Sequence, residues 1–111
     1  AANNLIKAAA SRRDEKNQVL AQLDAYERNV DKQLSQMSAQ LKIETDRATR
    51  GDSDAQQSAT ATRNAQQLHK EMDELKRQQS QQVQQQQKTA EQLEQQAQGF
   101  ESEAKTLQSQ A

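Results

Sequence analysis

The sequence contains no cysteine, proline or tryptophan, and its 111 residues include only two glycines, one tyrosine and one phenylalanine. Without cysteine, the chain has no disulfide framework and no thiolate metal site. Hydrophobic residues make up 32% of the chain, against about 45–50% in typical soluble domains. This shortage of large apolar side chains argues against an ordinary compact globule, and with it against an enzyme that has a dry, shaped pocket.

The chain also lacks an excess of charge of one sign and any long hydrophobic run. It carries 15 Lys and Arg against 16 Asp and Glu, for a formal net charge of −1. A general nucleic-acid-binding protein normally has a basic excess or stripe, and the one small basic cluster, Arg12 and Arg13, is followed at once by Asp14 and Glu15. No stretch approaches the ~18 consecutive apolar residues of a membrane-spanning helix. We therefore expect neither a nucleic-acid partner nor a transmembrane segment.

Alanine and glutamine dominate what is present, with 17 and 23 residues. Together with Glu, Lys, Arg and Leu they are good helix formers, and this is the composition of long helices. The low mean hydropathy of −1.26 leaves disorder as the alternative. The apolar residues recur at intervals of three and four, however, which is the period of an amphipathic helix. The sequence therefore predicts an all-α protein.

Stop and start signals divide this pattern near the middle of the chain. Asn3 or Asn4 is a candidate N-cap for a first helical arm over 4–49. Gly51 suits the position just past a helix end, where a positive φ is often needed. Ser53 and Gln56 read as a capping box that opens a second arm over 55–110. A helix–helix turn is therefore predicted near residues 50–54.

The two arms carry matching apolar stripes. If the chain folds back at this turn, residues whose numbers add to about 105 face each other, and the apolar pairs satisfy this: Leu5–Phe100, Ala9–Ala97, Val30–Leu75, Leu34–Met72, Met37–Leu68 and Leu41–Ala65. This match between the apolar positions of the two arms predicts a long antiparallel αα-hairpin that resembles a coiled coil. In the middle, Val19, Leu23 and Tyr26 would face glutamines of the run 78–87, which leaves these three side chains half covered.

Other short motifs carry little chemistry. Arg50-Gly51-Asp52-Ser53 matches an integrin-binding tetrapeptide in letters, and each residue also has a role in ending or starting a helix. His69 and Asp73 are too few ligands for a zinc site. The acidic residues of the second arm, including Glu94 and Glu101, are assigned to solvated helix faces because nothing here builds the pocket that acid–base catalysis needs.

These observations predict a non-enzymatic structural or assembly protein without cofactor or metal, a helical hairpin that serves as spacer, brace or subunit in a larger complex. Its expected partners are other proteins or further copies of itself, bound through Val19, Leu23, Tyr26, Leu93, Phe100 and Leu107. The Cys-free composition and the start at Ala1 without Met favour a bacterial envelope, periplasmic, secretion-system or phage setting. Two alternatives remain: a binding module that presents the tip Arg50, Gly51, Asp52 and Ser53 to a receptor, and a coiled-coil dimer of continuous helices.

Overall fold

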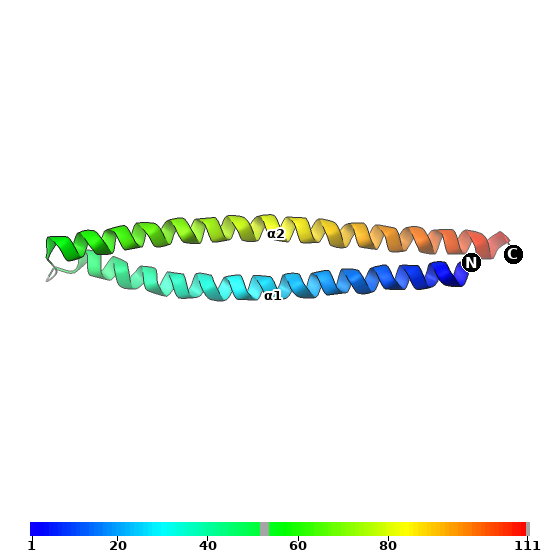
Figure 1. Ribbon diagram of the computed structural model, residues 1–111, viewed down its shortest axis with the longest axis horizontal. Helices are drawn as coiled ribbons and strands as arrows, with labels where there is room; N and C mark the ends of the chain where they lie inside the picture. The colour runs from blue at the N-terminus through cyan, green and yellow to red at the C-terminus, as the bar shows by residue number, and fades with distance from the viewer. Residues whose placement is uncertain (52–53, 111) are drawn as a thin grey trace. The chain divides into compact units, whose positions relative to one another are not determined.

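The computed structural model describes residues 1–51 and 54–110, and nearly all of them lie in two helices. The first, α1, spans Ala2–Thr49 and the second, α2, spans Ala55–Gln110, and the described residues include no strand. The two helices run in opposite directions (Figure 1). This confirms the predicted all-α helical hairpin. The alternative of one continuous helix is wrong, because α1 ends at Thr49 and α2 begins only at Ala55.

The helix ends differ in detail from the sequence prediction. Leu5 N–H donates to the carbonyl of Ala1 at 3.2 Å, so α1 starts before Asn3 and Asn4, and neither of these is its cap. At the start of α2, Asp54 Oδ1 accepts the Gln57 N–H at 2.7 Å. Asp54 is therefore an N-cap of the usual acidic kind, whereas the proposed cap Ser53 lies outside the described residues.

The prediction of a left-handed glycine at the turn is wrong. Neither Gly51 nor Gly99 has a positive φ, so Gly51 does not end α1 in the αL conformation that commonly follows a helix. At the end of α1, Thr49 Oγ1 donates back to the carbonyl of Thr45 at 3.0 Å, a contact that helical threonines commonly make with the preceding turn.

The chain divides into two compact units, each made of one segment from each helix. We call them the terminal unit, Ala1–Ala25 with the chain from Gln82 onward, and the turn unit, Tyr26–Gln81. Within each unit the helix segments are antiparallel. In the turn unit, Glu44 contacts Asn64 while the earlier residue Asp31 contacts the later residue Gln79.

The core of the terminal unit consists mostly of alanine. Its buried residues are Ala9, Leu23, Ala90, Ala97 and Ala104. Those of α2 recur every seven residues, and half-buried side chains at 93, 100 and 107 recur at the same interval. A repeat of seven corresponds to 3.5 residues per turn, the period of a left-handed coiled coil. Small buried side chains of this kind leave room for the two helices to pack closely along the row.

Buried positions of the turn unit also recur every seven residues, but alanine does not dominate them. Val30 and Ala61 are buried, and the carboxylate residue Glu44 is buried as well, at 5% exposure. Val30 and Glu44 lie fourteen residues apart, which is two repeats of seven, and Met37 between them is half-buried. A charged residue thus occupies a position that the repeat would give to an apolar one.

Gly99 offers a direct test of how much helix propensity limits stability. It lies on an exposed position inside α2, and a Cβ added there meets no atom within 4 Å. Because glycine costs about 1 kcal/mol relative to alanine in a helix interior, we expect Gly99→Ala to raise the free energy of unfolding by roughly 0.5–1 kcal/mol, measured by urea denaturation followed by circular dichroism. Gln95→Ala, at an exposed position of the same helix, is the control and should change stability less. A G99A variant that is no more stable than the wild type would contradict this expectation.

Candidate interaction surface

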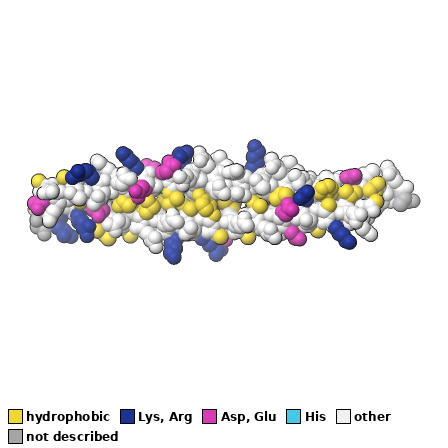
Figure 2. All heavy atoms as spheres, viewed as in Figure 1, with side chains coloured by type: hydrophobic (Ala, Val, Ile, Leu, Met, Phe, Trp, Pro, Cys, Tyr) yellow, Lys and Arg dark blue, Asp and Glu magenta, His cyan; other side chains and the backbone are white. Residues whose placement is uncertain are grey.

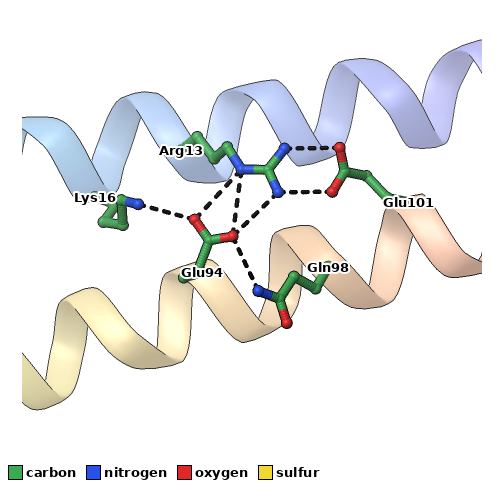
Figure 3. A network of polar contacts seen from close by, with 5 residues as sticks. All are labelled: Arg13, Lys16, Glu94, Gln98 and Glu101. Atoms are coloured by element: carbon green, nitrogen blue, oxygen red, sulfur yellow. Dashed lines mark hydrogen bonds and ion pairs between the residues drawn. The ribbon is translucent and has the colours of Figure 1, made fainter.

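Charged side chains of the terminal unit form a network that joins the two helices (Figure 3). Arg13 of α1 donates from Nη1 and Nη2 to the two carboxylate oxygens of Glu101, at 2.7 and 2.6 Å. The same guanidinium donates to Glu94 from Nη2 at 3.1 Å and from Nε at 3.3 Å. Lys16 Nζ lies 2.8 Å from Glu94 Oε1, and Gln98 Nε2 adds a longer contact of 3.4 Å. Such charge-assisted, bidentate contacts use the planar fork of arginine.

Sequence reasoning missed this network and placed Glu94 and Glu101 on solvated faces. Arg13 is separated from them by 81 and 88 residues, so only the register between the helices brings the three together. One signal was present in the sequence. Each of the two glutamates follows a core alanine by four residues, and positions that flank the buried row are where coiled coils form interhelical ion pairs.

The network shifts the protonation of its carboxylates. Hydrogen bonds from Arg13 first, and from Lys16 second, lower the pKa of Glu94 to about 2. The hydrogen bond from Arg13 also lowers the pKa of Glu101, and both carboxylates raise the pKa of the Arg13 guanidinium. All of these contacts favour the charged forms, so the network is intact at neutral pH.

This pKa shift predicts a loss of stability in acid. Because the pKa of Glu94 is about 2 in the folded chain against 4.5 for an ordinary glutamate, its contribution is complete above about pH 4.5 and disappears as the pH falls towards 2. We expect the urea midpoint of the wild type to fall over this range, and to fall less in Arg13→Gln, where Glu94 loses its main donor. Lys7→Gln, which removes a cation from the same helix outside the network, should retain the wild-type slope. Equal slopes for R13Q and the wild type would show that the network does not set the acid response.

The network also fixes which residues share a side of the terminal unit. In a helix with this repeat, positions three and four after a buried residue flank it on opposite sides. Arg13 follows Ala9 by four, and Glu94 and Glu101 likewise follow buried alanines by four. Since these residues contact one another, the positions at plus four lie on one side of the core in both helices, and we call this side the charged flank.

The positions at plus three therefore share the opposite side. We call this side the apolar flank and define it by the large apolar residues that occupy it, all of them half-buried: Leu5, Val19, Leu93, Phe100 and Leu107. Hydrophobic side chains gather along the line between the helices in Figure 2. The charged flank carries apolar residues as well, Ile6 and Leu20, which are 45% and 40% exposed.

The structure separates the six residues that the sequence proposed for partner binding. Val19, Leu93, Phe100 and Leu107 lie together on the apolar flank. Leu23 is 7% exposed and belongs to the core between the helices, so it offers little surface. Tyr26 is half-buried in the turn unit. Sequence reasoning omitted Leu5 from this set. Leu5 lies fourteen residues, or two repeats of seven, before Val19, and this spacing places it on the same flank.

The predicted tip motif is described only in part. Arg50 and Gly51 follow the end of α1, whereas Asp52 and Ser53 lie outside the described residues. An open hollow of about 580 Å³ lies beside this part of the turn unit, lined by polar and charged residues that include Arg50, Asp54 and Glu44. Glu44 accepts hydrogen bonds there from Gln40 at 3.1 Å, Arg47 at 3.3 Å and Asn64 at 3.4 Å.

Two further features of the described residues bear on the expected partners. Residues 1–51 and 54–110 contain no group of three or more His, Cys, Asp or Glu residues arranged to hold a metal ion, and His69 is exposed. Neither α1 nor α2, as far as their residues are described, has the apolar length to cross a membrane. Comparison of the chain with protein-family models, with curated proteins and with solved structures finds no match.

Proposed function

We propose that this chain is a non-enzymatic structural or assembly protein, a helical hairpin that acts as a spacer, brace or subunit of a larger complex. One observation carries the proposal: five of the seven core residues, Ala9, Ala61, Ala90, Ala97 and Ala104, are alanines, and among the described residues no large side chain is fully buried. Burying a large apolar side chain contributes about 1.5–3 kcal/mol, so a partner that covers the half-buried leucines and Phe100 would add stabilisation that the hairpin alone does not gain.

The chemistry of the surface supports a protein partner over other classes. The charges balance to −1 over the whole chain, and the ion pairs of the terminal unit are satisfied between its own helices. A surface of this kind offers no basic stripe for a nucleic-acid backbone. The setting that we propose, a bacterial envelope, periplasmic or secretion-system assembly, is supported by the Cys-free, Ala- and Gln-rich composition alone.

A photo-crosslinking experiment in the native source tests this function. A photoreactive phenylalanine analogue replaces Phe100 on the apolar flank, and in a matched chain it replaces Gln95, an exposed residue of the same helix. Irradiation should give discrete high-mass adducts from position 100 and few from position 95. A chain that is recovered as a free monomer from native extracts, with no adducts from position 100, would overturn the proposal.

A further inference from the structure

The two flanks of the terminal unit differ in how far contacts within the chain pair or bury their side chains. On the charged flank, Arg13 of α1 binds Glu94 and Glu101 of α2. Lys16, which lies seven residues after Ala9 on the core row, also binds Glu94. On the apolar flank, the phenyl ring of Phe100 and the leucines lie beside a core row of alanines and remain half-buried. We propose that a second copy of this chain docks on the apolar flank, so that two terminal units bury these side chains between four helices. This inference rests on the proposed structural function and names its partner.

The size of the flank is sufficient for a stable dimer. The α1 segment of the terminal unit ends at Ala25, which corresponds to a length of roughly 36 Å at 1.5 Å per residue. Two helices side by side are about 20 Å wide. The footprint is therefore roughly 700 Å² per copy, close to the ~800 Å² per partner of a standard-size interface.

The charge pattern favours a second copy over a partner of one sign. A two-fold contact brings the same surface from both copies together, so its charges must be self-complementary. The apolar flank carries Arg12, at the position three after Ala9, and this arginine pairs with Glu15 of its own helix at 3.3 Å. Each copy thus brings both signs to the contact, and the net charge of −1 produces little long-range repulsion between copies.

The two flanks of α1 provide matched variants for the test. Leu5 and Val19 lie on the apolar flank, and their sequence neighbours Ile6 and Leu20 lie on the charged flank. We therefore compare Leu5→Gln/Val19→Gln with Ile6→Gln/Leu20→Gln. Each double variant removes two aliphatic side chains from the same helix, and glutamine keeps a high helix propensity. Sedimentation velocity over about 1–500 µM measures the dimer Kd, and circular dichroism at the same concentrations measures helicity.

We expect the full-length wild type to dimerise. In a two-fold dimer the Leu5/Val19 double variant loses four buried side chains, and its Kd should rise about 100-fold or more. The Ile6/Leu20 variant should change Kd by less than about threefold. Similar effects of the two double variants would overturn the inference, because the dimer contact would then not lie on the apolar flank.

A measurement on the wild type alone keeps the test valid if a variant unfolds. Dilution should shift the NMR signals of the Phe100 ring and the Leu93 methyl groups, and it should leave those of Ile6 and Leu20 unchanged. A wild type that stays a helical monomer up to the highest concentration rejects the second copy as the partner. If position 100 still crosslinks in the native source, the proposed function survives that result, whereas a monomer in both experiments removes both proposals.

Discussion

Replacement of Ala97 by leucine is expected to lower the free energy of unfolding by about 2 kcal/mol, because it overpacks a completely buried position of the helix interface. Ala97 is completely buried, and it lies between two further core alanines, Ala90 and Ala104, at intervals of seven. A leucine there cannot turn towards solvent, so the helices must separate or the side chain must adopt a strained rotamer.

Urea denaturation of Ala97→Leu, followed by circular dichroism at one fixed protein concentration, measures this effect. Gln95→Leu is the control, since residue 95 is exposed on the same helix and both variants introduce the same side chain. Gln95→Leu should change the free energy of unfolding by less than about 0.5 kcal/mol. If Ala97→Leu is as stable as the wild type, the helices are not in close contact along the alanine row.

The sequence predicted the helices and their separation well because those features are local. The three–four spacing of apolar residues and the cluster of Gly51, Asp52, Ser53 and Asp54 depend only on neighbouring residues, and the structure places the end of α1 at Thr49 and the start of α2 at Ala55. The details at the turn were less predictable. Ser53 and Asp54 are both good N-cap residues, and the sequence pattern alone did not single out Asp54, whose carboxylate accepts the Gln57 N–H.

The interaction surface was less predictable because it depends on the register between the two helices. Spacing alone grouped Leu23 with Val19, although the structure buries Leu23 in the core. Spacing alone also gave no reason to connect Arg13 with Glu94, whose contact joins residues 81 positions apart. Once that contact is known, the repeat of seven shows which neighbouring residues lie on the core row and which lie on each flank.

Glu44 is a buried residue that the spacing of apolar residues did not predict. Its replacement should raise the free energy of unfolding, whereas that of Ala97 should lower it. The residue is 5% exposed, and its hydrogen bonds from Gln40, Arg47 and Asn64 are 3.1–3.4 Å long. The desolvation cost of a buried carboxylate commonly exceeds what such contacts return. We therefore expect Glu44→Leu to raise the free energy of unfolding by about 1–3 kcal/mol. Thr45→Leu, at the exposed neighbouring position, is the control and should change it little.

The same replacement should also allow more than one register between the two helices. A carboxylate that accepts a hydrogen bond from Asn64 of the other helix selects one alignment, as buried polar residues do in coiled coils, whereas a leucine can slide along an apolar row. Because the chain has no cysteine, spin labels can be attached through Ser38→Cys and Lys70→Cys, one on each helix of the turn unit. The distance distribution between these labels should be wider in Glu44→Leu than in the wild type. A destabilised variant with an unchanged distribution would show instead that the carboxylate contributes net stability and does not select the register.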